Sequence, residues 1–229
     1  MLNIFKSSSS EIWQQKQDEL IASLTYQPLL IVLRITEDDL DNLEIKSFLT
    51  LIKTLQSLGV RNIEIAWSSH KNWIKFIQEI KKEFKEISFG AASITNSNSL
   101  ELITKLGFNY AMSPCWDIEL QKRAKALGQA LVPGVLSPSD IQQAKNFGYR
   151  IIKLFPASVI GINYLNQIKA SINPLPFVIA AGGMSIININ SWLEQGYGAI
   201  AVGRELIQKE SVDPQLAEWL KATPNFSTN

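Results

Sequence analysis

The sequence predicts an α/β protein with a closed (β/α)₈ barrel, the TIM-barrel architecture, and one extra helix at its N-terminus. Short runs of branched and aromatic residues alternate with longer amphipathic segments, a pattern typical of parallel sheets covered by helices. A glycine stands just before most of the short runs, where a helix C-terminus favours a left-handed residue. Eight such units in a chain of 229 residues fit a barrel of typically about 250 residues.

The expected elements follow one another without a visible linker. We expect residues 1–229 to form one barrel domain, with the extra helix over 11–24, Ser10 as its N-cap, and a flexible tail over 223–229. Helices such as 45–58 and 74–84 separate the strands. The expected strands are 29–35, 62–67, 87–94, 109–113, 130–135, 150–155, 177–181 and 199–203. The helix-ending glycines are Gly59, Gly107, Gly128, Gly148 and Gly196 or Gly198.

An open doubly wound sheet is the rival architecture. It would usually carry a glycine-rich phosphate loop directly after its first strand. Here the segment Thr36-Glu37-Asp38-Asp39 stands in that place. The closed barrel is therefore the favoured prediction.

Composition excludes several classes of protein. Hydrophobic residues make up 46% and charged residues 19% of the chain, enough apolar material for a full core, so a disordered chain is excluded. Lys and Arg number 22 against 21 Asp and Glu, and this balance gives no general attraction to nucleic acid or to an anionic membrane. The apolar runs are shorter than the ~20 residues of a membrane helix, and residues 1–16 lack the core of a secretory signal. We expect a cytoplasmic protein without nucleic-acid or membrane partners.

The single cysteine and the single histidine restrict the possible chemistry. Cys115 alone excludes an intramolecular disulfide framework, and with His70 alone a His/Cys zinc site is excluded and a Ser-His-Asp triad is improbable. The sequence also lacks metal-ligand clusters, and we expect neither a metal nor a cofactor. His70 is expected to be exposed at a helix start.

Lys153 interrupts an otherwise apolar strand. Side chains alternate along a strand, so Ile152 and Leu154 would face the helices while Ile151, Lys153 and Phe155 would face the barrel axis. A buried lysine is costly unless its charge is paired or its pKa falls, and a neutral amine is the nucleophile that forms a Schiff base. The alternative is a lysine that extends to solvent from the strand end or is paired structurally.

Two further polar residues lie in or at the end of expected strands. Glu64, between Ile63 and Ile65, should also face the axis, either to neutralise the lysine in a salt bridge or to move protons. Arg34 ends its strand at the catalytic face, where it could bind a carboxylate or a phosphate or simply be a surface arginine.

Small residues at other strand ends leave room for a ligand. In Gly90-Ala91-Ala92-Ser93, Ser93 could donate to a substrate oxygen, although small residues also serve packing alone. Gly182 and Gly183 end the seventh strand and Gly203 and Arg204 the eighth, where barrels commonly bind phosphate through backbone N–H groups. Alternatively, the paired glycines serve only the backbone conformation of a turn.

These residues together resemble the 2-keto-3-deoxy-6-phosphogluconate / 4-hydroxy-2-oxoglutarate aldolase family of class I aldolases. The resemblance runs from about Gln27 to Arg204, and the lysine strand is its most specific part. Its motifs are Gly59-Val60-Arg61-Asn62-Ile63-Glu64, Gly90-Ala91-Ala92-Ser93, Ser113-Pro114, Pro133-Gly134-Val135, Ile152-Lys153-Leu154-Phe155-Pro156-Ala157 and Gly182-Gly183.

The resemblance implies a role for each matching residue. Lys153 would form the Schiff base, Glu64 would be the acid/base, and Ser93 would contact the pyruvyl carboxylate, with Phe155 and Pro114 as walls of the pyruvate pocket. It implies a lyase of carbohydrate metabolism that cleaves 2-keto-3-deoxy-6-phosphogluconate, 4-hydroxy-2-oxoglutarate or both to pyruvate and an aldehyde. It also implies a homotrimer that needs no metal.

The sequence departs from the family pattern at several motif positions. These are Ser68 (arginine in the family), Ala92 (glycine), Ser93 (threonine), Cys115 (glycine), Ala181 (threonine) and Arg204 (serine). Ser93 keeps a hydroxyl, so pyruvate binding is expected. For the missing arginine, either Arg34 or Arg204 compensates or the substrate differs.

Two other functions stay open at this point. The first is another phosphate-binding barrel enzyme, an epimerase or a thiamine-phosphate-synthase-like enzyme, which would bind phosphate and form no imine. The second is a catalytically degenerate barrel that acts as a binding protein, which the altered motif positions favour.

Overall fold

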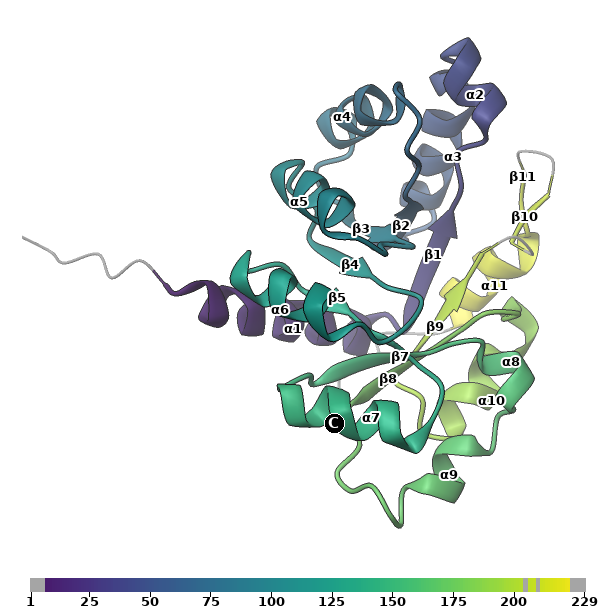
Figure 1. Cartoon of the computed structure of the whole chain (residues 1–229). Helices are drawn as coiled ribbons and strands as arrows, with labels where there is room; N and C mark the ends of the chain where they lie inside the picture. The colour runs from purple at the N-terminus through teal and green to yellow at the C-terminus, as the bar shows by residue number, and fades with distance from the viewer. Residues whose placement is uncertain (1–6, 204–205, 209–210, 223–229) are drawn as a thin grey trace, which may run out of the picture.

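The computed structural model describes residues 7–203, 206–208 and 211–222, and its centre is a parallel sheet rolled into a barrel (Figure 1). In this part of the chain, nine strands join in the order β5-β4-β3-β2-β1-β9-β8-β7-β6. The strands are β1 (Leu29–Leu33), β2 (Asn62–Ala66), β3 (Ser88–Ala92), β4 (Tyr110–Met112), β5 (Leu131–Val132), β6 (Gly134–Val135), β7 (Ile151–Leu154), β8 (Phe177–Ala181) and β9 (Ala199–Val202). Each strand lies within an expected strand, so the predicted fold class is confirmed.

The barrel closes through one strand position that a proline divides into β5 and β6. Pro133 lies between them and has no N–H group to donate, but its carbonyl accepts a hydrogen bond of 3.0 Å from the Lys153 N–H. On one side Leu131 pairs with Ala111 of β4, and on the other Gly134 pairs with Lys153 of β7. β5 and β6 thus act as a single position, and the sheet has the eight positions that the sequence predicts.

Helices surround the barrel, as Figure 1 shows. They are α1 (Ser9–Tyr26), α2 (Glu37–Asn42), α3 (Ile45–Ser57), α4 (Trp73–Glu83), α5 (Ser97–Lys105), α6 (Ile118–Ala126), α7 (Pro138–Phe147), α8 (Ala157–Ile160), α9 (Tyr164–Ile168), α10 (Ile189–Glu194) and α11 (Pro214–Ala222), with a 3₁₀ turn over Ile186–Asn188. Two features add to the predicted elements: the short helix α2 directly after β1, and the antiparallel hairpin of β10 (Ile207–Gln208) and β11 (Ser211–Val212).

Alternation along the strands separates two apolar layers. On β7, Ile152 and Leu154 pack outward in the large core between sheet and helices. Ile151 packs in a second cluster, the barrel interior. Lys153 has the same parity as Ile151, so the fold turns its side chain inward as the sequence pattern predicts.

α1 closes the end of the barrel where the strands begin. Its Leu20 and Leu24 belong to the inner apolar cluster, so they fill the barrel from this end. Ser23 of α1 donates to the side chain of Asn62, the first residue of β2, at 3.0 Å. With this end filled, space for a ligand is left at the carboxyl ends of the strands.

The N-terminus of α1 differs from the prediction. Its N-cap is Ser8 and not Ser10, which lies inside the helix. Ser8 and Glu11 form a reciprocal capping box, because each side chain accepts from the other residue's backbone N–H. The expected tail over 223–229 lies outside the described residues.

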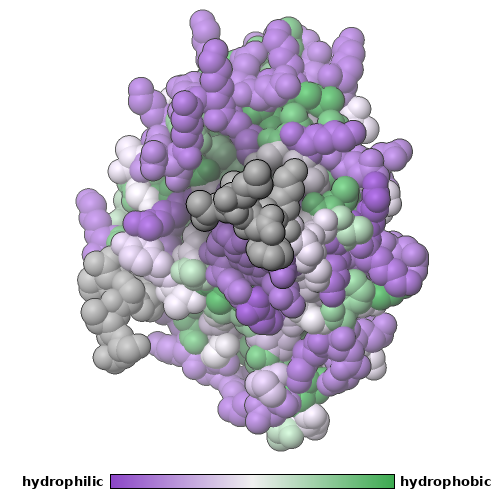
Figure 2. Space-filling view, turned by 90° about the vertical axis from the view of Figure 1, so that its left-hand side faces the viewer, coloured by the Kyte–Doolittle hydropathy of each residue, from purple (hydrophilic) through white to green (hydrophobic). Residues whose placement is uncertain are grey.

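The surface agrees with helices that turn polar faces outward. Figure 2 shows the side of the molecule that lies at the left of Figure 1, where hydrophilic side chains predominate and hydrophobic residues are visible as small separate patches. Among the described residues, no helix has the length and apolar character needed to cross a membrane.

Candidate active site

A cavity of about 350 Å³ opens at the carboxyl ends of the strands. Its walls come from both halves of the barrel, and they include every predicted site residue except Arg204, which lies outside the described residues. The lining residues are Val32, Arg34, Glu64, Ala92, Ser93, Pro114, Lys153, Phe155, Ala181, Gly182, Gly183, Met184, Ala201 and Gly203. Residues far apart in the sequence therefore meet in one pocket, at the end of the barrel where catalytic groups of this architecture lie.

Lys153 reaches the cavity from the middle of β7. Only 9% of the residue is exposed. Burial lowers the pKa of its amine, while the nearby acidic groups of Glu64 and, secondly, Cys115 oppose this shift. Its Nζ lies 5.5 Å from the centre of the Phe155 ring, which forms the adjacent wall. The amine is thus held in an apolar setting that favours its neutral, nucleophilic form.

Glu64 faces the cavity from β2, on the other side of the barrel. The residue is 3% exposed, and burial raises the pKa of its carboxyl to about 7, a shift that the charge of Lys153 reduces. Both side chains lie within the described part of the chain, yet they form no direct ion pair. The carboxyl and the amine are therefore separated by the cavity, and a simple salt bridge across the barrel, one of the two expectations for Glu64, is not what the structure contains.

Ser93 and Arg34 extend the cavity wall beyond these two residues. Ser93 has a left-handed backbone with φ of 64°, which is uncommon for a residue other than glycine and clusters at functional sites. Arg34 follows β1 and is exposed, with its side chain on the cavity wall. Among the described residues that line the cavity, Arg34 and Lys153 are the only basic ones, and burial favours the neutral form of Lys153. Arg34 is therefore placed to attract an anionic group of a ligand.

The glycine pair after β8 permits a close approach of two loops. Gly183 has φ of 72°, and a Cβ atom there would lie 2.2 Å from the Ser158 hydroxyl oxygen. The carbonyl of Gly182 accepts a hydrogen bond of 3.2 Å from the Ser158 N–H. The pair fixes the β8 loop against α8, the short helix that follows β7, and Phe155 just after β7 and the glycine pair both line the cavity.

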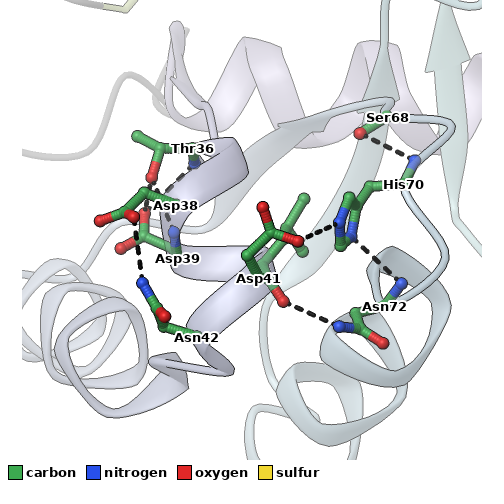
Figure 3. A network of polar contacts seen from close by, with 9 residues as sticks. Thr36, Asp38, Asp39, Asp41, Asn42, Ser68, His70 and Asn72 are labelled. Atoms are coloured by element: carbon green, nitrogen blue, oxygen red, sulfur yellow. Dashed lines mark hydrogen bonds and ion pairs between the residues drawn. The ribbon is translucent and has the colours of Figure 1, made fainter.

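A polar network joins α2, the short helix after β1, to the loop after β2 (Figure 3). His70 Nε2 lies 3.0 Å from Asp41 Oδ1 of α2, and the Asn72 N–H donates to His70 Nδ1 at 3.2 Å. The expectation of an exposed His70 is wrong, because its side chain is only 18% exposed. Ser68 belongs to this network, where its hydroxyl oxygen accepts from the His70 N–H, and it is not among the cavity-lining residues.

Five lining residues are not among the predicted site residues: Val32, Ala92, Ala181, Met184 and Ala201. Ala92 and Ala181 stand in or beside motifs that the sequence analysis quoted, and strand alternation could have identified Val32 and Ala201. Val32 lies two residues before Arg34 and Ala201 two before Gly203, so each shares the inward parity of a predicted residue. Met184 follows the glycine pair in a loop, where no periodicity applies.

Comparison with known proteins shows which family the chain resembles over most of its length. The family model described as KDPG and KHG aldolase matches residues 21–221. A 2-dehydro-3-deoxy-phosphogluconate aldolase of Pseudoalteromonas atlantica is 28% identical over 182 residues, which are 79% of this chain and 82% of the relative. A 2-dehydro-3-deoxy-6-phosphogalactonate aldolase of Escherichia coli is 24% identical over 204 residues, 86% of this chain and 95% of the relative.

A solved structure shares the fold over nearly the whole chain. It is the KDPG aldolase of Legionella pneumophila with pyruvate captured as a covalent carbinolamine, with a TM-score of 0.71, 20% identity, and coverage of 95% of this chain and 98% of that one. A parallel barrel with a buried amine beside a cavity defines a class of barrel enzymes capable of imine chemistry. Because the family model spans most of its length, the chain belongs to the KDPG and KHG aldolase family.

Proposed function

We propose that this protein is a class I Schiff-base aldolase that cleaves a 2-keto-4-hydroxy acid to pyruvate and an aldehyde. The substrate is 2-keto-3-deoxy-6-phosphogluconate, 4-hydroxy-2-oxoglutarate or both. The observation that carries the proposal is the buried Lys153 amine, held at the carboxyl ends of the strands with the Glu64 carboxyl across the cavity. The names of the two relatives, both aldolases for 2-keto-3-deoxy sugar acid phosphates, support it.

Lys153 begins the reaction as a neutral amine. Its nitrogen lone pair attacks the C2 ketone carbon of the substrate and gives a carbinolamine. Glu64 donates a proton to the carbinolamine oxygen, which leaves as water, and the nitrogen becomes part of an iminium ion. The lowered pKa of Lys153 favours the first step, because only the unprotonated amine attacks.

Glu64 then acts as a base. It takes the proton of the C4 hydroxyl, the C3–C4 bond breaks, and the bonding electrons move toward the iminium nitrogen to give an enamine. The aldehyde leaves, Glu64 returns the proton to C3, and water hydrolyses the imine to release pyruvate and the free amine. A carboxyl pKa of about 7 suits this alternation, since proton donation and acceptance are both accessible near neutral pH.

The other site residues bind the substrate in this proposal. Ser93 donates to the pyruvyl carboxylate, and Pro114 and Phe155 enclose the methyl end of pyruvate. Arg34 binds the anionic group at the far end of the substrate, in place of the arginine that the family often has at the position of Ser68.

A phosphate would lie near the loops after β8 and β9. Gly182, Gly183 and Gly203 border this part of the cavity. Arg204, the next residue, lies outside the described residues and remains a candidate from the sequence alone.

We also propose a homotrimer in the cytoplasm. Exposed apolar side chains near the ends of β6 and β7 support self-association, with exposed fractions of 51% for Leu136 and 81% for Val159. Light scattering coupled to size exclusion would give three times the chain mass, and a monomer would contradict the trimer. A single cysteine agrees with a reducing compartment, which cell fractionation would test.

The decisive experiment traps the imine. The protein is incubated with pyruvate and borohydride, and the modified lysine is mapped by peptide mass spectrometry. The chain supplies internal controls, because burial also lowers the pKa of Lys16 and Lys81, which lie away from the cavity. We expect the reduced adduct on Lys153 alone and none in Lys153→Met.

Each other outcome has a meaning. Modification spread over Lys16, Lys81 and Lys153 would contradict a dedicated Schiff-base site. Inorganic phosphate binding without an adduct would favour another phosphate-binding barrel enzyme. The absence of both phosphate binding and an adduct would favour a degenerate binding protein. A steady-state comparison of phosphorylated and unphosphorylated 2-keto-4-hydroxy acids, with released pyruvate measured by lactate dehydrogenase, identifies the preferred substrate.

A further inference from the structure

On the inward face of β2, Nδ2 of Asn62 lacks a hydrogen-bond partner among the described residues, while its Oδ1 accepts from Ser23 at the closed end of the barrel. Closer to the cavity, two more buried polar atoms lack such partners: Oε1 of Glu64 and the hydroxyl of Tyr110. Both residues are deeply buried, with 3% and 1% of their surfaces exposed. Buried polar groups in native proteins are almost always paired, so two such atoms in one interior require a common explanation.

Strand register brings the two side chains to one level of the barrel. Glu64 of β2 pairs with Gly90 of β3, and Gly90 pairs in turn with Tyr110 of β4. All three positions have the inward parity. Glu64 and Tyr110 are thus next-but-one neighbours around the wall, with only a glycine between them.

Gly90 lets the tyrosine ring cross β3. A Cβ atom at Gly90 would lie 2.1 Å from Cε2 and 2.4 Å from Cζ of Tyr110, so the ring occupies the space that any other residue's side chain would take. Cε2 and Cζ form the hydroxyl end of the ring. The hydroxyl therefore extends across β3 in the direction of β2 and its carboxyl.

We infer that Tyr110 is a positioning residue for Glu64 and that its hydroxyl donates to the Glu64 carboxyl through one buried water. The two atoms form no direct hydrogen bond, and a water bound to both would satisfy both. This contact would hold Oε1 in place and leave the second carboxyl oxygen to exchange protons with the substrate. The functional part of the inference rests on the acid/base role proposed for Glu64.

The charges around Glu64 are consistent with this assignment. Lys153 faces it from β7, and Arg34 lines the same cavity at the end of β1. The strands beside β2 contribute Val32 and Gly90 at this level, which do not titrate. Burial and, secondly, the charge of Glu64 raise the pKa of Tyr110 well above its usual value, so its hydroxyl keeps its proton and stays a donor.

The test is Tyr110→Phe, which removes the hydroxyl and keeps the ring. The pKa of Glu64 is read from a carbon-13 NMR titration of its carboxyl, assigned with Glu64→Gln, and this reading requires no turnover. Loss of a donor to the carboxylate should raise that pKa by about one unit. With substrate, kcat should fall about fivefold while KM stays unchanged.

Tyr197→Phe is the matched control. Tyr197 is also buried, at 3% exposure, but it packs on Trp192 in the outer core. Removal of its hydroxyl should leave the pKa of Glu64 and kcat unchanged. A purely structural role of Tyr110 would lower the melting temperature in Tyr110→Phe without moving the carboxyl titration.

An unchanged Glu64 pKa in folded Tyr110→Phe would overturn the inference. If that variant does not fold, the wild type decides: the Cζ resonance of Tyr110 should titrate with the midpoint of Glu64, and an invariant resonance would equally overturn it. The proposed function is judged separately, because the borohydride adduct on Lys153 requires no contribution from Tyr110.

Discussion

Lys153 and Glu64 face one cavity from opposite walls of the barrel. Their strands, β7 and β2, are separated by β1, β9 and β8 on one side and by β3, β4 and the divided β5–β6 position on the other. Burial shifts both groups toward their neutral forms, raising the pKa of the carboxyl to about 7 and lowering that of the amine. A ketone attached to the amine would therefore lie between the nitrogen that attacks it and the carboxyl that moves its protons.

The pKa of Glu64 predicts how stability depends on pH. A carboxyl whose pKa rises on folding, here from 4.5 to about 7, binds its proton more tightly in the folded protein. Its contribution is therefore favourable at low pH and is lost as the pH rises from 4.5 to 7. Relative to Glu64→Gln, the wild type should lose about 3 kcal/mol of unfolding free energy over this range. Urea unfolding at pH 5 and pH 7.5 measures the change.

Lys153 should enlarge the pH dependence of the stability difference between the wild type and Glu64→Gln. Without the Glu64 charge, the pKa of the buried amine falls further, so the variant gains additional stability as the pH rises. Glu86→Gln is the control, because Glu86 is exposed and its replacement should change the unfolding free energy little. A pH-independent difference for Glu64→Gln would contradict the burial of the carboxyl.

Arg34 should determine affinity for the anionic end of the substrate. Arg34→Gln removes a charged hydrogen-bond donor, and we expect KM for a phosphorylated 2-keto-4-hydroxy acid to rise about tenfold or more, with kcat little changed. The pyruvate adduct on Lys153 should still form, because pyruvate lacks that end. Arg61→Gln is the control, since Arg61 lies over the Tyr26 ring at 4.0 Å and does not line the cavity. Equal KM values for Arg34→Gln and the wild type would remove Arg34 from the binding site.

The sequence pattern is sufficient to predict several of the residues that face the cavity. Lys153 and Glu64 stand between branched apolar residues, and alternation alone assigns such positions to the barrel interior. Arg34 and Gly203 follow from their places at strand ends, where the barrel architecture collects its functional residues. These assignments need only local pattern and the fold class.

The remaining features depend on contacts between distant segments. The pairing of His70 with Asp41 joins the loop after β2 to the short helix α2, and neither segment has a periodic pattern that would reveal it. Tyr110 has the alternation of an inward residue, but its approach to Glu64 becomes visible only with the register that places Gly90 between them. The division of a strand at Pro133 likewise depends on which neighbour each half pairs with.

Gly183 should be less tolerant of substitution than another left-handed glycine. Gly59 has φ of 88° and open space where a Cβ would lie, whereas a Cβ at Gly183 would collide with Ser158. Gly59→Ala and Gly183→Ala should each cost about 1 kcal/mol of backbone strain, and only Gly183→Ala should also reduce kcat/KM, because the loop at the cavity must move.

Ser158→Gly provides the rescue for Gly183→Ala. It removes the side chain that the new methyl group would meet, so the double variant should recover most of kcat/KM while the backbone strain remains. Melting temperatures and kcat/KM of the four variants measure the two effects separately. If Gly183→Ala matches Gly59→Ala in both melting temperature and kcat/KM, the contact between Gly183 and Ser158 does not hold the β8 loop in place.

The pair His70 and Asp41 should steady the segment that carries Arg34. Because Nδ1 of His70 accepts from the Asn72 N–H, the neutral ring carries its proton on Nε2 and donates it to Asp41 of α2, which begins three residues after Arg34. Asp41 is 67% exposed, so the pair should contribute about 1 kcal/mol at most. His70→Ala should therefore barely change the melting temperature, yet it should speed amide hydrogen exchange in α2 and raise KM for the phosphorylated substrate about twofold or threefold. Asp41→Ala should have the same effects. The double variant should add little to either single variant, because both single changes break the same contact. Fully additive effects on hydrogen exchange would show that His70 and Asp41 act on α2 independently.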